Sequence, residues 1–287
     1  MGKLYVTIVV AISVMLCGCA TVYNPATEQN ELIFINTPSE VSLGNSIATK
    51  ISKQYKISKD IEKLNRVNEI GQKIAMVSDR KDLKYRFSVI EDNELNAFTT
   101  PGGYIYINSG VVEKSTEDEL ACVIGHEIGH VAARHIVKKI QAQLGYDILI
   151  TIASRKAGLG KFQKAVSLGY NLVTLGYSRE DEMLADRLGS KYAYKAGYDP
   201  YAMISFLKKL QGSKNSDIGP VFLRSHPYTT QRISMLEKQI PTIIAKALPD
   251  RTETASAEKR PLKVMCPECR RIFPGRTNYC PYDGTKL

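Results

Sequence analysis

The sequence predicts an α+β fold, in which one mainly helical domain carries a small sheet and a small cysteine-rich module follows at the C-terminus. Three observations support this prediction: a long, capped helical stretch at 116–139, strand patterns just before it, and a cysteine-rich tail after a polar linker. The 287 residues, with a hydrophobic content of 44%, leave room for one domain of roughly 200 residues and small appendages.

Residues 1–18 have the pattern of a lipoprotein signal peptide. Lys3 supplies a positive charge, and the apolar run from Leu4 to Leu16 is shorter than the ~20 residues that cross a membrane. Leu16-Cys17-Gly18-Cys19 resembles a bacterial lipobox, which implies cleavage before Cys19 and acylation of its thiol. Because Ala20 follows instead of Asp, the resemblance favours the outer membrane, facing the periplasm. An uncleaved signal anchor is the alternative.

The segments that follow predict the order of the elements. Residues 19–40 are polar and mixed, so they are interpreted as a lipidated tether, and residues 41–248 carry the domain. Apolar residues spaced by three and four predict a helix over 61–77. Alternating side chains predict strands over 84–90 and 104–107, and a Pro-Gly-Gly turn lies between them. Later helices are expected from Ser178 and over about 200–210 and 229–240.

The stretch from Thr116 to Lys139 is predicted to be one helix, which Thr116 and Glu119 begin as a capping box. It contains His126-Glu127-Ile128-Gly129-His130. Histidines four apart share a helix face and can bind one zinc ion. Glu127, about 100° round the helix, lies beside such a metal, where its carboxylate can take a proton from an activated water. The same pattern also occurs by chance in ordinary helices, where a neighbour satisfies each histidine.

Other residues of this helix have structural interpretations. Gly125 and Gly129, four apart, leave a groove where another element can approach closely. His135 lies about 180° from His126 on a helical wheel, so it is predicted to point away from the metal as a surface or packing residue. Cys122 is expected to be a small buried residue and not a ligand.

A catalytic zinc site needs a third protein ligand and an open position for water. The acidic turn that follows Ser178 supplies the candidates. Glu182 and Asp186 are four apart, which favours Glu182 as the ligand and Asp186 as the partner of a ligating histidine's outer N–H. Asp181 fits a second capping box, and Glu180 is expected in solvent. An acid-rich first turn can also compensate the helix dipole without binding metal.

Three motifs, in order, resemble the gluzincin peptidases related to the CAAX prenyl endoproteases. This group includes HtpX, the Oma-type proteases and bacterial outer-membrane lipoprotein proteases. The motifs are NAFxxPGG before the HExxH helix, YSRxxExxAD after it, and His-Pro with a downstream Arg, and the likeness covers about 41–240. The resemblance implies a zinc metallopeptidase domain in which His126, His130 and Glu182 bind zinc, Glu127 is the general base and Asp186 supports a ligand.

The third motif concerns His226 and Arg232. The resemblance implies that His226 stabilises the oxyanion or caps the metal at rest, and that Arg232 is the arginine that accompanies it. Without the resemblance, a loop histidine before Pro227 would be interpreted as having no catalytic role.

The C-terminal part departs from the relatives. Residues 249–263 contain few apolar side chains and predict a linker, and residues 264–287 form a cysteine-rich tail. CPxC…YCPxDGTxL resembles a degenerate zinc ribbon, with an aspartate where a fourth cysteine usually stands. In an oxidising compartment the cysteines could form a disulfide, such as 266–269, instead of binding metal. The possible ligands of a second, structural zinc ion are Cys266, Cys269, Cys280 and Asp283.

The formal net charge of +10 is spread along predicted helices without aromatic interleaving, so nucleic acid is not expected as a partner. A solvated surface is favoured, with attraction to anionic lipid as the second interpretation. Taken together, the sequence predicts a membrane-anchored zinc endopeptidase that acts on polypeptides, in particular misfolded or unassembled envelope proteins. The alternatives are a non-catalytic chaperone or assembly lipoprotein that uses the same cleft, and a binding module built on the C-terminal ribbon.

Overall fold

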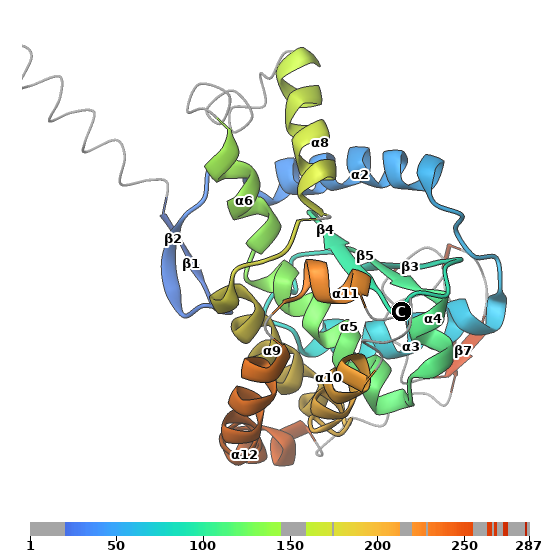
Figure 1. Ribbon diagram of the computed structural model, residues 1–287, viewed down its shortest axis with the longest axis vertical. Coiled ribbons are helices and arrows are strands. Elements are labelled where there is room, and N and C mark those ends of the chain that lie inside the picture. Colours follow the sequence, from blue (N-terminus) through green and yellow to red (C-terminus); the bar gives the residue numbers. More distant parts are fainter. Residues whose placement is uncertain are drawn as a thin grey trace, which may run out of the picture.

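The structure is a computed structural model that describes residues 21–144, 159–173, 175–212, 220–227, 229–254, 263–265, 267–268, 272–274 and 285. Its described part is mainly helical with small sheets, which confirms the α+β prediction (Figure 1). The elements are, in order, β1 (Thr21–Asn24), β2 (Gln29–Leu32), α2 (Thr37–Gln54), α3 (Ile61–Val77), β3 (Arg86–Ile90), β4 (Ala97–Thr100), β5 (Tyr104–Asn108), α4 (Ser109–Lys114), α5 (Glu117–Ala132), α6 (His135–Gln143), α8 (Leu159–Val173), α9 (Arg179–Lys195), α10 (Ala202–Gly212), α11 (Pro220–Ser225), α12 (Thr229–Thr254), β6 (Lys263–Met265) and β7 (Ile272–Pro274).

The two predicted strands, β3 and β5, and a further strand, β4, form a three-stranded sheet of order β3-β5-β4, with β3 parallel to β5 and β4 antiparallel to it. Strand β3 begins at Arg86, two residues later than the alternating pattern indicated. The turn between β4 and β5 contains Gly102 and Gly103 at φ 78° and 84°, a left-handed conformation that favours glycine. The sheet lies against α3 and α5, and its edge strand β4 has only buried side chains.

Helices α5 and α9 cross closely at the centre of the molecule (Figure 1). A Cβ atom added to Gly125 would lie 2.8 Å from the carbonyl oxygen of Gly189, and one added to Gly129 would lie 2.9 Å from that of Ala185. The close approach predicted from the two glycines of α5 is therefore confirmed. It brings the acidic first turns of α9 next to the histidines of α5.

The prediction of one helix over 116–139 is wrong. The capping box of Thr116 and Glu119 does begin α5, but α5 ends at Ala132 and α6 starts at His135. Between them Arg134 has a left-handed backbone, with φ 55°. Its guanidinium group lies 3.2 Å from the hydroxyl of Thr37 and 3.5 Å from a carboxylate oxygen of Glu40. These tertiary contacts hold a conformation that arginine rarely adopts.

Two segment boundaries also differ from the prediction. Within 19–40, the interpretation as a tether is wrong from Thr21 on, because a β-hairpin and the first turn of α2 occupy these residues. The hairpin is held to α6 by an ion pair between Glu31 and Lys138. At the other end, α12 continues to Thr254, so the first part of the predicted 249–263 linker is helical.

Other sequence predictions lie outside the described residues. These are the signal peptide over 1–18, the lipidation site Cys19, and the possible ligands Cys266, Cys269, Cys280 and Asp283. The described residues near the C-terminus include an antiparallel pair of strands, β6 and β7. None of the helices in the described ranges is both long and apolar enough to cross a membrane.

Candidate metal centre

Four side chains converge where α5, α9 and the end of α11 meet. Ligand atoms of His126, His130, Glu182 and His226 all lie within 4.8 Å of one another. The Nε2 atoms of His126 and His130 are 3.0 Å apart, and Glu182 Oε1 lies 3.4 Å from His130 Nε2. All four residues are at most 1% exposed. The structure thus brings together the three residues predicted as ligands and His226, which was expected either to stabilise the oxyanion or to cap the metal.

The outer nitrogen of His126 is held by a carboxylate. Its Nδ1 lies 2.8 Å from Asp186 Oδ1, and Arg232 binds both oxygens of Asp186 at 2.7 Å. Burial would raise the pKa of Asp186, but the charge and hydrogen bonds of Arg232 outweigh burial and lower it. Asp186 is therefore an acceptor, so His126 Nδ1 donates the hydrogen bond. The lone pair of His126 is left on Nε2, which faces the cluster.

The outer nitrogen of His130 contacts His135, which corrects the prediction that His135 points away. Because the helix is interrupted at Arg134, the His135 side chain turns back toward α5, and its Nδ1 lies 2.8 Å from His130 Nδ1. Its Nε2 lies 3.3 Å from Asp181 Oδ1, and the residue is 3% exposed. Burial lowers the pKa of His135 to about 4, although Asp181 pulls it upward, so the ring is neutral near pH 7.

The direction of the hydrogen bonds in the series His130, His135 and Asp181 follows from the Asp181 carboxylate, which can only accept. If Asp181 accepts from His135 Nε2–H, then His135 Nδ1 carries a lone pair and accepts from His130 Nδ1–H. The lone pair of His130 is then on Nε2, beside that of His126. The capping box confirmed between Ser178 and Asp181 also fixes this carboxylate at the start of α9.

The donor set fits a zinc ion. With the donors assigned in this way, two imidazole lone pairs face each other across 3.0 Å, and a cation bound between them would relieve their repulsion. Burial lowers the pKa of His130 well below its ordinary value, so this imidazole is neutral. Burial alone would raise the pKa of Glu182, but His226 and Arg232 hold it well below the usual range, and the carboxylate is ionised. Two imidazoles and one carboxylate form a ligand set of catalytic zinc sites.

Glu127 lies beside the cluster. Among the residues that the structure describes, neither of its buried carboxylate oxygens has a hydrogen-bond partner, and Oε1 contacts His226 Nε2 only as an ion pair at 3.5 Å. Burial raises the pKa of Glu127, and the neighbouring histidines only partly oppose this effect. A buried carboxylate without a hydrogen bond is costly for stability, so it indicates a group kept for chemistry.

His226 closes the fourth side of the cluster. Its Nδ1 lies 3.0 Å from Glu182 Oε1 and 3.2 Å from His126 Nε2, and its Nε2 lies 3.3 Å from the carbonyl oxygen of Ala97. Burial would lower the pKa of His226, but the carboxylates of Glu182 and Glu127 outweigh burial and raise it. The protonated ring then donates from Nδ1 to Glu182 and from Nε2 to the carbonyl oxygen of Ala97. Arg232 donates to the backbone oxygen of His226 and lies 2.8 Å from Glu182 Oε2, which it contacts as an ion pair without hydrogen-bond alignment.

Two contributors to the site were missed by the sequence reasoning, His135 and Tyr177. The Tyr177 ring stacks on that of His130 with centroids 3.9 Å apart, and Lys139 Nζ lies 4.1 Å from the Tyr177 centroid. The signal for Tyr177 was an aromatic residue directly before the Ser178 cap. Of the other candidates, Cys122 is buried as expected, and its Sγ lies 3.4 Å from the carbonyl oxygen of Asp199. Glu180 is exposed.

Comparison with known proteins places this arrangement in a family. The chain is 29% identical over 181 residues to the beta-barrel assembly-enhancing protease of Escherichia coli K12. This match covers 58% of the chain and 37% of that protein. It is 27% identical over 244 residues to a putative beta-barrel assembly-enhancing protease of Vibrio cholerae, covering 77% of the chain and 50% of the relative. The mitochondrial metalloendopeptidase OMA1 of Schizosaccharomyces pombe is 30% identical over 178 residues, 61% of the chain and 52% of that protein.

The chain therefore spans about half or less of the length of these relatives. The profile of peptidase family M48 matches residues 62–240, a range that contains every member of the cluster and Glu127. This match covers more than half of the chain, so the chain belongs to peptidase family M48, a family of zinc metallopeptidases.

Proposed function

We propose that the protein is a zinc-dependent endopeptidase of the bacterial cell envelope that hydrolyses peptide bonds in misfolded or unassembled envelope proteins. The observation that supports catalysis is the buried carboxylate of Glu127, which has no hydrogen-bond partner among the described residues and lies beside three convergent ligand groups. The names of the relatives, which are proteases and metalloendopeptidases, support peptide hydrolysis. Envelope substrates are supported by the beta-barrel assembly-enhancing proteases among them.

The mechanism assigns one role to each side chain. A zinc ion held by His126, His130 and Glu182 would supply Lewis-acid activation of a water molecule and of the scissile carbonyl. Glu127 accepts the proton of the attacking water and delivers it to the amine nitrogen as the peptide bond breaks. The raised pKa of Glu127 suits both steps, because a carboxylate with a pKa nearer neutrality both accepts and returns a proton.

His226 has two roles in this proposal. At rest its Nδ1 fills the fourth side of the cluster, 3.2 Å from His126 Nε2, and no polypeptide can reach residues that are at most 1% exposed. When the short helix α11 moves away, the position becomes open for water and substrate. The imidazole N–H can then stabilise the oxyanion that forms at the scissile carbonyl. An extended substrate would pair with edge strand β4, from which the packed helix α8 must withdraw.

The proposed location rests on the N-terminal sequence. Cleavage before Cys19 and acylation of its thiol would anchor the protein to the outer membrane on its periplasmic side. Replacing Cys19 by serine should leave the chain unprocessed, whereas replacing Cys17 should not. Mass spectrometry of the native membrane protein would contradict this assignment if it found an intact, unacylated N-terminus.

We also propose a second, structural zinc ion in the tail, bound by Cys266, Cys269, Cys280 and Asp283. The antiparallel strands β6 and β7 support this assignment, since Cys266 directly follows β6. A disulfide is the competing state in an oxidising compartment. Two zinc ions per chain, falling to one in a Cys269→Ser/Cys280→Ser variant, would support the ribbon. One zinc ion in both proteins would exclude it.

The catalytic proposal is tested by Glu127→Gln, which keeps the size of the side chain but removes its basicity. Cleavage of an unfolded outer-membrane polypeptide should fall at least 10²-fold, since removal of a general base costs about that much or more. Zinc content should stay at the wild-type level because Glu127 is not a ligand. Glu180→Gln, an exposed carboxylate on α9, is the matched control.

Two outcomes of this test would change the assignment. Turnover of Glu127→Gln near the wild-type rate would exclude the mechanism. If neither the wild type nor Glu127→Gln cleaves the unfolded polypeptide and both bind it equally well, the chaperone or assembly alternative is favoured instead.

A further inference from the structure

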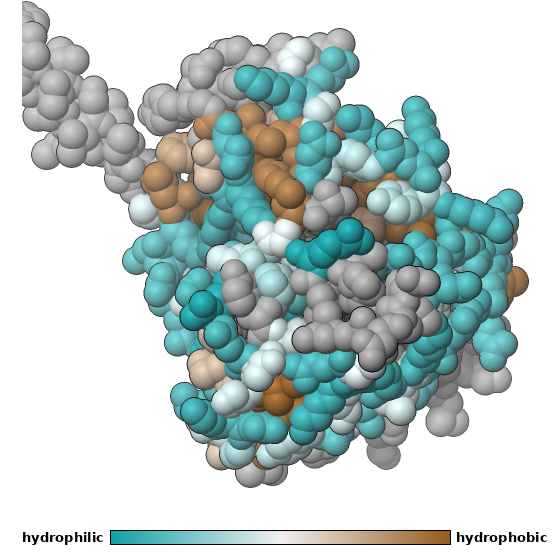
Figure 2. All heavy atoms as spheres, in the orientation of Figure 1, coloured by the Kyte–Doolittle hydropathy of each residue, from teal (hydrophilic) through white to brown (hydrophobic). Residues whose placement is uncertain are grey.

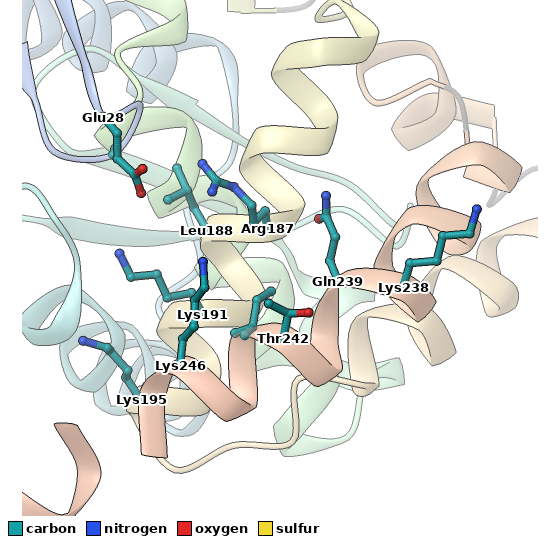
Figure 3. A pocket seen from close by; sticks show the side chains of 11 residues that line it. Glu28, Arg187, Leu188, Lys191, Lys195, Lys238, Gln239, Thr242 and Lys246 are labelled. Atoms are coloured by element: carbon teal, nitrogen blue, oxygen red, sulfur yellow. The ribbon is translucent and has the colours of Figure 1, made fainter. Parts of the chain in front are cut away.

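A cavity of about 330 Å³ lies between α9, α12 and the turn of the β1–β2 hairpin (Figure 3). It shares no lining residue with the metal cluster. Its lining contains five cationic side chains and a single acidic one, Glu28, which comes from the hairpin turn. The cations are Arg187, Lys191, Lys195, Lys238 and Lys246.

These cations come from two neighbouring helices. Three of them follow each other at four-residue intervals along α9, and Lys238 and Lys246 lie eight residues apart on α12, so the cations of each helix share one face. Lys191 has a carboxylate partner, Asp79, at 3.0 Å. Among the side chains that the structure describes, no carboxylate pairs with Arg187, Lys238 or Lys246. Like charges thus repel one another within the groove, and a bound anion would relieve this repulsion.

The remaining lining residues indicate what kind of anion fits. Gln239 and Thr242 offer an amide and a hydroxyl group between the lysines of α12. Ala26, Leu188 and Ile243 add an apolar part to the wall. A small inorganic anion would gain nothing from contact with the apolar wall, whereas an amphiphilic anion would contact both the cationic and the apolar surface.

The hairpin next to the groove exposes large hydrophobic side chains. Val22, Tyr23 and Leu32 are 47%, 59% and 53% exposed, and they are three of the six exposed large hydrophobic residues in the described part of the chain. The strand register places Tyr23 and Leu32 on the same face of the hairpin. Figure 2 shows apolar atoms gathered at the end of the molecule that carries the hairpin, α6 and α8. Aromatic and aliphatic side chains beside basic ones are typical of a surface that contacts a membrane.

We propose that this groove binds the phosphate head group of an anionic glycerophospholipid. The planar guanidinium group of Arg187 can pair with two phosphate oxygens, and the lysine amines add charge around them. The apolar wall and the exposed hairpin face would contact the glycerol backbone and the first acyl carbons. The hairpin begins at Thr21, directly after Cys19 and Ala20, so an acylated Cys19 would lie within roughly 7 Å of extended chain from it. The head-group site itself requires neither acylation nor peptidase activity.

The absence of tryptophan from the chain allows a direct test. In the full chain, held in non-ionic detergent micelles, Ile243→Trp places one fluorophore in the groove, and Ile61→Trp places one on exposed α3 as a control. Bromine-labelled phosphatidylglycerol should quench the groove tryptophan at an at least tenfold lower mole fraction than bromine-labelled phosphatidylcholine. The control tryptophan should respond equally to both lipids. High salt should reduce the preference, because the attraction is between charges.

Charge-reversed variants locate the binding. Lys238→Glu/Lys246→Glu should abolish the preference for phosphatidylglycerol, while Lys53→Glu/Lys59→Glu, which changes the net charge equally on exposed residues elsewhere, should keep it. Thermal melting followed by circular dichroism checks that both variants are folded. Neither pair of substituted residues touches the metal cluster, so the rate of peptide cleavage should equal that of the protein without these substitutions.

Four results would overturn the proposal. Equal quenching by the two lipids, or an equal loss in both charge-reversed pairs, would mean that only net charge matters. Displacement of the lipid by millimolar glycerol 3-phosphate or inorganic phosphate would assign the groove to a soluble phosphate. Displacement by a single-stranded oligonucleotide at micromolar concentration, dependent on Lys238 and Lys246, would assign it to nucleic acid.

Discussion

The chain of contacts from Asp181 through His135 to His130 predicts that zinc binding depends on a residue that never touches the metal. Asp181→Asn keeps the shape of the side chain, and its amide oxygen can still accept the capping hydrogen bond from Ser178 N–H. Its NH₂ group, however, can face His135 Nε2 and donate to it. His135 would then carry its proton on Nδ1 and donate to His130 Nδ1, which moves the proton of His130 to Nε2. A protonated Nε2 cannot bind zinc.

The expected magnitudes follow from the geometry. Loss of an outer hydrogen-bond partner of a metal ligand costs about 10–100-fold in affinity, or roughly 1.4–2.7 kcal/mol. Asp181 lies 3.3 Å from His135 and its side chain is 30% exposed, so water can replace part of the contact and about tenfold is expected. His135→Ala removes a 2.8 Å contact at a position that is 3% exposed, so about 100-fold is expected. His135→Asn can place its amide oxygen near the former Nδ1 and should recover most of this loss.

The assay is the zinc dissociation constant, measured at pH 7.5 by competition with a chromophoric chelator. Glu180→Gln, at an exposed position in the same turn of α9, controls for the loss of one negative charge. Thermal unfolding of the metal-free proteins separates lost zinc affinity from a lost fold. The reasoning is refuted if Asp181→Asn and His135→Ala both bind zinc within twofold of the wild type, or if His135→Asn binds as weakly as His135→Ala.

Three further perturbations probe the metal centre and the hairpin. Zinc affinity should fall most for Glu182→Ala, which removes a ligand, and by about 10–100-fold for Asp186→Ala, which removes only a partner of a ligand; the reverse order in zinc titrations would contradict the assigned ligands. Gly189→Ala would place a Cβ atom 2.6 Å from a backbone nitrogen of α5, so it should destabilise the fold by about 1–3 kcal/mol in chemical denaturation, whereas Gly160→Ala, with no described neighbour within 4 Å of its Cβ, should not. Burial would raise the pKa of Glu31, but hydrogen bonds from the α6 lysine and from the hairpin outweigh burial and lower it. Its stabilising effect is thus present above its ordinary pKa of 4.5 and lost as the pH falls through the lower folded value, so Glu31→Gln should increase hydrogen exchange of the hairpin at pH 7 and have little effect well below pH 4.5.

The parts of the site that could be predicted depend on short-range sequence patterns. The spacing of His126 and His130, the caps at Thr116 and Ser178, and the four-residue pairing of Glu182 with Asp186 all follow from helical geometry. These patterns hold because each lies within one uninterrupted helix, where residue spacing fixes direction.

The parts that could not be predicted depend on contacts distant in sequence. No glycine, asparagine or proline marks the break at Arg134, so a helical wheel over 116–139 places His135 on the wrong side. The hairpin over 21–32 did carry a signal, because Asn24-Pro25 is a turn dipeptide and the Asn24 side chain accepts from Ala26 N–H at 3.0 Å. The polar composition of its strands outweighed that signal.

The break at Arg134 connects the metal site to the N-terminal part of the chain. The carboxylate of Glu40, at the start of α2, lies 3.2 Å from the guanidinium of Arg80 and 3.5 Å from that of Arg134, and it accepts a hydrogen bond from Gly102 N–H. This single buried carboxylate therefore joins the end of α5 to the turn of the β4–β5 hairpin. Glu40 lies outside residues 62–240, which the family profile matches. A fragment limited to that range would keep every side chain that faces the cluster, but it would lose the contacts that turn His135 back onto His130.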